Sequence, residues 1–209
     1  MFQTIKPLIL ASGSPRRKAL LTTLGIDFSV VVPEVDESRV AGEMEETYTL
    51  RMAQLKGDAV SKTNPSAWIV SADTIVVFED RLLTKPANPD QAVEMLLLLS
   101  GREHQVRTGF CLCCLDRNVR VVRSVVSRVR FKHFDLDWAK AYTRTGEPLD
   151  KAGGYGIQGR GGVLVESLNG SYSNVVGLPL AEVVDLLSEH GVIVAADENQ
   201  AGKDRVNKG

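Results

Sequence analysis

Short apolar runs alternate with amphipathic stretches along this chain, and this alternation predicts an α/β protein. Apolar and β-branched runs predict strands over residues 8–11, 28–32, 68–72, 75–78, 82–83, 102–115, 119–131, 163–165 and 172–176. Apolar residues at three- and four-residue spacing, together with cap residues, predict helices over residues 15–24, 47–61, 89–100, 135–145 and 179–190.

Turn residues between these runs predict hairpins. Residues 116–118 join two long β-rich runs, which we expect to form the sheet of a second lobe, and Asn169-Gly170 marks another hairpin. No internal repeat and no Pro- or Ser-rich linker divides the sequence. We therefore expect a single domain over residues 1–195, followed by a polar, flexible tail over residues 196–209.

The start of the first helix combines features of an anion site. The apolar run 8–11 leads through a Ser-Gly-Ser turn at residues 12–14 to Pro15, with Ser14 placed as the N-cap. Helix N-termini attract anions, yet the basic residues 16–18 occupy the first turn. Either these are solvated surface charges or they bind phosphate, and the small residues of the turn favour a phosphate site.

Carboxylates follow two of the predicted strands. One acidic loop covers residues 33–38, and such loops are either simply solvated or hold a divalent cation. Asp73 stands between two apolar runs, where a carboxylate is costly to bury without a partner. It either turns a strand corner through backbone hydrogen bonds or belongs to a site.

Two further segments have both a structural and a functional interpretation. Lys56 falls on the apolar stripe of its helix, so its ammonium either reaches solvent or points into a site toward phosphate. Residues 150–162 are rich in glycine and have no periodicity. They form either a loop that crosses between lobes or a binding loop, in which Tyr155 would stack on a base and Gln158 would read its edge.

Composition narrows the choice of function. The chain has 209 residues, 44% of them hydrophobic, with a formal net charge of −1, which provides no global attraction to nucleic acid or to a membrane. The sequence carries no apolar run of bilayer length and no signal peptide, so we expect a cytoplasmic protein. Three closely spaced cysteines, 111, 113 and 114, are interpreted as reduced core residues rather than a disulfide framework or a zinc site.

Four motifs in order resemble the Maf family of nucleoside triphosphate pyrophosphatases. They are Ser-Gly-Ser-Pro-Arg-Arg at residues 12–17, Ser-Ala-Asp-Thr at 71–74, Lys-Pro at 85–86 and Asp-Lys-Ala-Gly-Gly-Tyr-Gly-Ile-Gln-Gly at 150–159. The likeness extends over roughly residues 8 to 190. It implies a fold similar to inosine triphosphatase, in which a mixed twisted sheet with flanking helices forms two lobes around a central cleft.

The resemblance also implies residue roles. Family members hydrolyse nucleoside triphosphates between the α and β phosphates, with a divalent cation that we expect to be Mg²⁺ or Mn²⁺. By position, Asp73 would be the proton acceptor and Glu37 a metal-associated acid, and both would contact the metal. The phosphate ligands would be Ser12, Arg16, Arg17, Lys56 and Lys85.

Substrate preference is likewise an expectation from the resemblance. Arg16, Thr74 and Gln158 match the branch that prefers dTTP and UTP, including modified pyrimidine nucleotides. The alternatives are the same reaction on 7-methyl-GTP or a non-standard purine, and a nucleotide-binding regulator of cell division without catalysis. The expected partner is the triphosphate substrate, without nucleic acid or membrane, and the sequence allows a homodimer.

Overall fold

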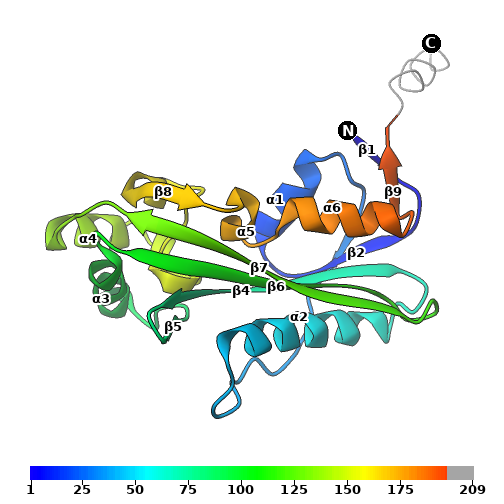
Figure 1. The fold of residues 1–209 in the computed structure, drawn as a ribbon, viewed down its shortest axis with the longest axis horizontal. Helices are drawn as coiled ribbons and strands as arrows, with labels where there is room; N and C mark the ends of the chain where they lie inside the picture. Colours follow the sequence, from blue (N-terminus) through cyan, green and yellow to red (C-terminus); the bar gives the residue numbers. More distant parts are fainter. Residues whose placement is uncertain (197–209) are drawn as a thin grey trace.

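One long twisted sheet runs the length of the molecule (Figure 1). The computed structural model describes residues 1–196. In spatial order, the sheet contains β3 (Ser29–Val31), β2 (Leu8–Ala11), β4 (Trp68–Phe78), β6 (Glu103–Cys114), β7 (Val119–Phe131) and β8 (Val165–Asn169), and β5 (Arg81–Leu83) pairs with β4. β2 is parallel to both of its neighbours, and the other pairs are antiparallel. The sheet is therefore mixed, as predicted.

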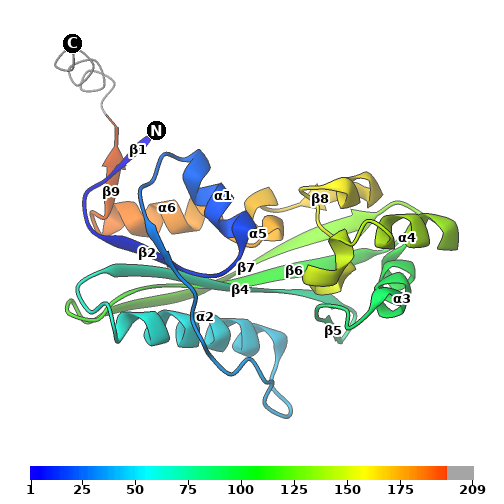
Figure 2. The ribbon, with the colours of Figure 1, turned by 180° about the vertical axis from the view of Figure 1, so that it is seen from behind.

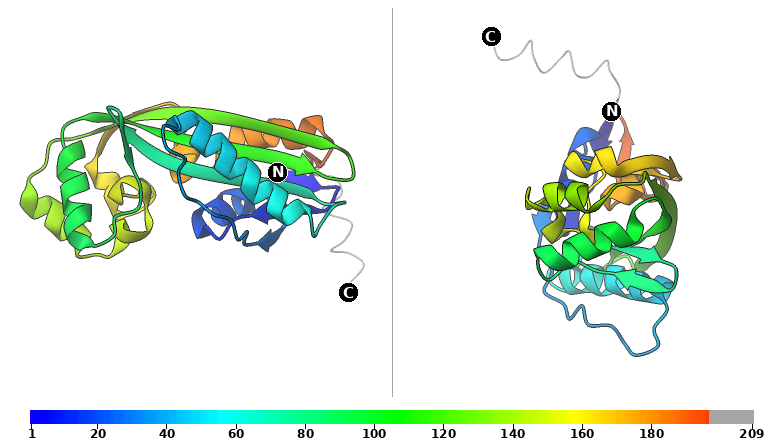
Figure 3. Two further views of the ribbon diagram at one scale, coloured as in Figure 1. Left: turned by 90° about the horizontal axis from the view of Figure 1, so that it is seen from below. Right: turned by 90° about the vertical axis from the view of Figure 1, so that its left-hand side faces the viewer.

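Helices cover both faces and one end of this sheet. α2 (Glu45–Ser61) lies along one face, whereas α1 (Pro15–Thr23) and α6 (Leu180–Glu189) lie on the other (Figures 1 and 3). At the far end, α3 (Pro89–Leu99) and α4 (Leu136–Thr143) form a second lobe together with the short 3₁₀ turns η1 (Glu147–Asp150), η2 (Ala152–Gly154) and η3 (Arg160–Leu164). Two lobes with flanking helices thus confirm the expected fold class.

The chain ends also pair with each other. β1 (Phe2–Thr4) and β9 (Ile193–Ala195) form a separate two-stranded antiparallel sheet. The predicted tail falls almost wholly outside the described residues. Among residues 1–196, no helix is both long and apolar enough to cross a bilayer.

Successive side chains of β4 point to opposite faces of the sheet, and so belong to two separate layers of the core. Val70 and Ala72 pack with α1 and α6, whereas Ile69 packs with α2. Gly109 of β6 allows α2 to lie directly on the sheet, because a Cβ atom there would be 2.4 Å from the carbonyl oxygen of Thr49. The close contact fixes the position of α2 over the middle of β4.

Four predictions about the fold were wrong. The strand expected over residues 163–165 is absent from the described structure, because residues 163 and 164 end the 3₁₀ turn η3 and β8 begins only at Val165. Residues 68–78 form one continuous strand rather than two runs with a corner at Asp73. β6 and β7 do not form a sheet of their own, since β6 pairs with β4 from residue 105 to 113. The predicted hairpin at Asn169-Gly170 is absent from the described structure, because residues 172–176 form the short helix α5 (Tyr172–Val176).

Local capping explains the helical state of α5. Ser171 is its N-cap and accepts a hydrogen bond from the backbone nitrogen of Asn174. The fully buried side chain of Asn174 donates to the carbonyl oxygen of Val106 and to Ser127 Oγ. These polar contacts outweigh the strand preference of the β-branched residues in this segment.

Candidate functional site

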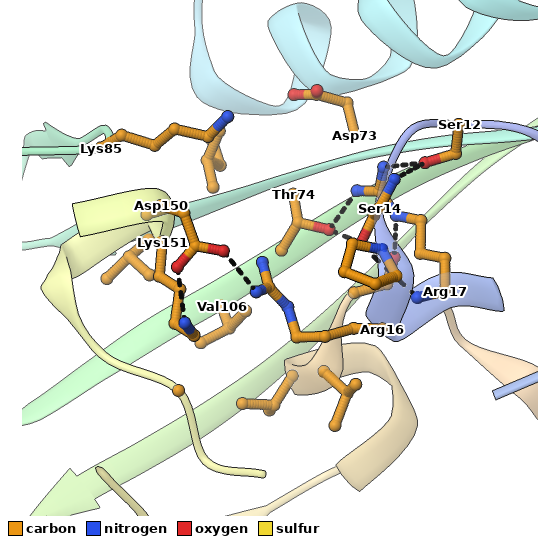
Figure 4. A pocket seen from close by; sticks show the side chains of 18 of the residues that line it. Ser12, Ser14, Arg16, Arg17, Asp73, Thr74, Lys85, Val106, Asp150 and Lys151 are labelled. Carbon is orange, nitrogen blue, oxygen red and sulfur yellow. Dashed lines mark hydrogen bonds and ion pairs between the residues drawn. The ribbon is translucent and has the colours of Figure 1, made fainter. Parts of the chain in front are cut away.

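The site lies where β4 changes its neighbour. On one side of β4, β2 pairs with residues 68–71 and β5 pairs with residues 76–78. Among the described strands, none pairs with residues 72–75 on that side, because β2 ends at Ala11 and the chain turns into α1. A cleft of about 890 Å³ opens there (Figure 4). Ligand sites in α/β sheets commonly form at such switch points, beyond the carboxyl end of a strand.

All nine predicted site residues line this one cleft. They come from the first turn of α1, the loop after β3, α2, the middle of β4, the segment after β5 and the glycine-rich segment, and they are Ser12, Arg16, Arg17, Glu37, Lys56, Asp73, Thr74, Lys85 and Gln158. The structure thus brings together residues that are up to 146 positions apart in the sequence, from 12 to 158.

Successive residues of β4 serve opposite sides of the cleft. Because side chains alternate along a strand, Asp73 points toward α2 and Thr74 points toward α1 and α5 (Figure 4). Thr74 Oγ1 lies 2.9 Å from Thr108 Oγ1, which fixes its orientation. The strand therefore presents a carboxylate on one face and a hydroxyl on the other, one residue apart.

Lys56 joins the two predicted carboxylates. Its Nζ atom lies 2.7 Å from Asp73 Oδ1 and 2.7 Å from Glu37 Oε1. The side chains of Lys56 and Asp73 are only 9% and 13% exposed, whereas that of Glu37 is 56% exposed. Of the two interpretations of Lys56, the structure confirms that it points into the site, but its contacts there are carboxylates.

The loop that carries Glu37 is tied to α2. This loop crosses the edge of the sheet from β3 to the start of α2 (Figure 2), and the hydroxyl of Tyr48 donates to the Glu37 carbonyl oxygen at 3.0 Å. Burial raises the pKa of Glu37, but the hydrogen bond and charge of Lys56, with the charges of Lys85 and Arg17, outweigh burial and hold it below its ordinary value.

The first turn of α1 has the predicted geometry. Ser14 is the N-cap and Pro15 the first helical residue, and the backbone nitrogen of Ser14 donates to Ser12 Oγ at 3.2 Å. Arg17 has a structural role. Its guanidinium donates hydrogen bonds to the Gly177 carbonyl oxygen at 2.7 Å, to Ser12 Oγ and to Thr74 Oγ1. Burial lowers the pKa of Arg17. Arg17 thus joins α1, β4 and the end of α5, while it also lines the cleft.

Arg16 reaches across the cleft to the second lobe. Its NH1 atom lies 3.0 Å from Asp150 Oδ2, and Lys151 Nζ lies 2.6 Å from the other oxygen of the same carboxylate (Figure 4). The side chain of Asp150 is 60% exposed, so this pair is accessible to a competing anion. Lys85 lies on the same side of the cleft as Asp150 (Figure 4).

The glycine-rich segment is partly regular and its tyrosine is buried. The predicted stacking role of Tyr155 was wrong, because its ring is 5% exposed and its hydroxyl lies 2.7 Å from Nε2 of the buried His104. The ring packs against Phe131 in the core of the second lobe. Gln158 is exposed and lines the cleft, so it can reach a ligand there. The predicted binding loop therefore offers its backbone and Gln158, but no aromatic face from Tyr155.

Sequence reasoning missed four polar residues of the site. Tyr48 holds the Glu37 loop, Asp150 and Lys151 meet Arg16, and Glu147 lines the cleft. Asp150 and Lys151 begin the glycine-rich motif, so that signal was available. Tyr48 and Glu147 stand in ordinary helical and turn contexts and carry no comparable signal.

The donor chemistry at Asp73 and Glu37 fits a divalent cation. Among the described residues, no three or more His, Cys, Asp or Glu side chains gather into a group that would hold a metal alone. Two carboxylates nevertheless meet at Lys56, and Mg²⁺ is commonly bound by one or two carboxylates together with substrate phosphates. A cation site that is completed by a nucleotide is consistent with this arrangement.

Comparisons with known proteins find similar sequences along most of this chain. A protein of Desulfotalea psychrophila named dTTP/UTP pyrophosphatase is 49% identical over 193 residues, which cover 92% of this chain and 99% of that protein. Proteins with the same name from Geotalea uraniireducens and Salmonella typhimurium are 45% and 46% identical, over 92% and 89% of this chain and 100% and 94% of their own lengths. The solved structure of the Staphylococcus aureus Ham1 protein is similar with a TM-score of 0.41 and 16% identity, over 60% of this chain and 72% of that chain.

The family is shown by a match along most of the sequence. The model of the Maf-like protein family matches residues 7–190, a range that contains every residue of the cleft described above. This chain belongs to the Maf-like protein family.

Proposed function

We propose that this protein is a nucleoside triphosphate pyrophosphatase that hydrolyses dTTP and UTP to the monophosphate and pyrophosphate. The observation that carries the proposal is the single cleft in which a cationic helix start, a lysine-linked carboxylate pair and a glycine-rich loop meet. The relatives described above, at 45–49% identity, carry the name of this activity.

Arg16, Ser12 and the first turn of α1 hold the polyphosphate at one end of the cleft. Backbone N–H groups at the start of α1 have no helical partners and point toward a bound anion. Arg16 exchanges its exposed partner Asp150 for a phosphate oxygen, since guanidinium groups bind phosphate strongly. Lys85 adds charge from the other lobe.

Asp73 accepts the proton of the attacking water. Lys56 engages Oδ1 of Asp73, and among the described residues no hydrogen bond is donated to Oδ2, which leaves that oxygen available to a water molecule. Glu37 and Asp73 would hold the divalent cation, which would neutralise phosphate charge in the transition state. The chain itself positions the two carboxylates through Lys56 and Tyr48.

Base selection is assigned to the other end of the cleft. Gln158 carries both a donor and an acceptor and can read the edge of a pyrimidine. Thr74 lines the same cleft, where its hydroxyl oxygen accepts a hydrogen bond from Arg17. Equal rates on purine triphosphates, including 7-methyl-GTP, would favour the alternative substrates.

Pyrophosphate release from a panel of nucleoside triphosphates tests the proposal. We expect hydrolysis of dTTP and UTP and a loss of at least about a hundredfold in Asp73→Asn, because positioned general bases contribute roughly 10²–10⁴-fold. Asp27→Asn is the matched control, since Asp27 is exposed and outside the cleft. Nucleotide binding without turnover by the wild-type protein would instead support a regulatory role.

Three further predictions belong to this proposal. A cytoplasmic location is tested by cell fractionation, and a homodimer by light scattering. Absence of nucleic-acid binding is supported by exposed arginines of β7 that already pair with acids, as Arg120 does with Asp58 and Arg130 with Glu166. A filter-binding assay at low salt measures nucleic-acid binding.

A further inference from the structure

The carboxylate of Glu147 binds the backbone of the loop that carries Gln158. Its Oε2 accepts the N–H of Arg160 at 3.0 Å, and its Oε1 accepts the N–H of Gly161 at 3.2 Å. Oε1 also accepts the hydroxyl of Tyr142 at 2.8 Å. Burial raises the pKa of Glu147, but these three hydrogen bonds and the charge of Lys151 lower it overall, so the group is held as a carboxylate.

Tyr142 completes the attachment from the other end of the loop. Its hydroxyl oxygen accepts the N–H of Gly156 at 3.0 Å while its proton is donated to Glu147. One tyrosine and one glutamate thus bind backbone groups at residues 156, 160 and 161. We refer to Tyr142 and Glu147 together as the loop brace.

Two glycines in this loop are required by contact with the brace. A Cβ atom on Gly161 would be 2.5 Å from the Tyr142 hydroxyl, and one on Gly159 would be 2.7 Å from Glu147 Oε1. Such distances are well inside van der Waals contact. Two of the glycines that mark this segment in the sequence, Gly159 and Gly161, therefore have a specific cause, which is the close approach of the loop backbone to two side chains.

Glu147 is an unexpected charge for a cleft that takes a polyanion. It lines the cleft, and a free carboxylate there would repel phosphate. Its carboxylate oxygens instead accept hydrogen bonds from three donors. Its backbone carbonyl oxygen accepts a hydrogen bond from Lys151 Nζ at 2.7 Å, and the same ammonium contacts Asp150 beside Arg16. The turn η1 therefore connects the loop to the residue that we assign to the phosphates.

We propose that Glu147 and Tyr142 are positioning residues for base selection, which hold residues 156–161 so that Gln158 faces the base. This inference rests on the proposed function. The hydrogen bonds from the brace to residues 156–161 go to backbone groups, so the brace acts through Gln158 and not on the reacting atoms. Loss of the brace should therefore change discrimination between bases more than it changes kcat.

Tyr142→Phe is the most conservative test. The substitution keeps the ring and leaves the Gly156 N–H without its acceptor. The free-energy cost of an unsatisfied buried donor is large enough to change the ratio of rates on two bases by about tenfold. Glu147→Gln places an amide NH₂ group against the backbone donors and should act in the same direction. Tyr172→Phe is the control, because Tyr172 is 47% exposed and lies outside the cleft.

The measurement is the ratio of kcat/KM for UTP to kcat/KM for GTP, with amide hydrogen exchange of residues 156–161 measured in parallel. We expect the ratio to fall about tenfold in Tyr142→Phe and in Glu147→Gln, with kcat on UTP within about threefold of wild type and faster exchange in the loop. Gln158→Ala should lower the ratio without faster exchange.

Two results would overturn the inference while the proposed function stands. One is an unchanged ratio in both brace variants although their loop exchanges faster, and the other is unchanged exchange and an unchanged ratio. If the wild-type protein releases no pyrophosphate from any triphosphate, the proposed function fails, and base selection by the brace fails with it, even where exchange shows that the brace orders the loop.

Discussion

Replacement of Lys56 by Met isolates the contact on which the proposed active site depends. Methionine keeps most of the length and apolar surface of the lysine side chain but removes the ammonium that lies 2.7 Å from both Asp73 and Glu37. The two carboxylates then face each other without a positive charge between them. The folded protein should lose stability, because the unfolded chain exposes both carboxylates to water.

The expected cost follows from the exposure of each partner. Removing one member of a buried ion pair costs about 3–5 kcal/mol, whereas an exposed pair contributes about 1 kcal/mol or less. The Asp73 side chain is 13% exposed but lines an open cleft, and Glu37 is 56% exposed. We therefore take the low end, about 3 kcal/mol. For a domain of this size that is a decrease in Tm of about 6–12 °C.

Thermal and urea unfolding of Lys56→Met in EDTA measure this loss, with Lys62→Met, at the C-cap of the same helix, as the control. Lys62 is exposed, so its replacement should change the free energy of unfolding by less than about 0.5 kcal/mol. Mg²⁺ should raise the Tm of Lys56→Met more than that of the wild type, because the freed carboxylates bind the cation in the folded state. A Lys56→Met protein as stable as wild type in EDTA would refute the reasoning.

Three other perturbations have defined outcomes. Gly109→Ala places a methyl group 2.4 Å from the Thr49 carbonyl oxygen and should lower the free energy of unfolding in urea by about 1–3 kcal/mol. Gly13→Ala is the control: the nearest atom to its new methyl group lies at 3.5 Å, so the free energy of unfolding should change by less than about 1 kcal/mol. Burial lowers the pKa of His104 to about 4, so between about pH 6.5 and pH 4 the imidazole takes up a proton only in the unfolded state. The free energy of unfolding should therefore fall by about 3 kcal/mol as the pH decreases across that range. His104→Gln should flatten the slope of the free energy of unfolding against pH. Asp150→Asn removes the anion that competes with phosphate for Arg16, so the KM for UTP should fall severalfold at low salt. The stability of the protein should change little, because the ion pair is exposed. An unchanged or higher KM would contradict that competition.

Local signals predicted the geometry of the first turn of α1 well. The cap residue Ser14, Pro15 and the basic first turn of α1 depend on backbone geometry that neighbouring residues determine. Asp73 was also identified from sequence, because a carboxylate between apolar runs needs a partner. Its partner Lys56 was recognised as a candidate, but the contact between them depends on how α2 packs on β6, and no local pattern encodes that packing.

Tertiary contacts decided the elements that sequence reasoning missed. Residues 172–176 contain tyrosine and two valines, which favour a strand, yet the cap at Ser171 and the buried amide of Asn174 make them helical. Tyr155 was expected to face a base because it lies in a glycine-rich loop. It faces the core because His104, 51 residues away in sequence, offers its hydroxyl a hydrogen-bond partner there.

Strands β4, β6 and β7 extend through both lobes, and this continuity governs how the molecule loses its structure. β4 contributes Val70 and Ala72 to the core of one lobe and Val76 and Phe78 to the core of the other. A cut between the lobes would divide three strands within their ladders, so neither fragment would retain a complete core. Denaturation should accordingly be all-or-none, without a stage in which the lobe that contains α1 persists after the lobe that contains α3 has melted.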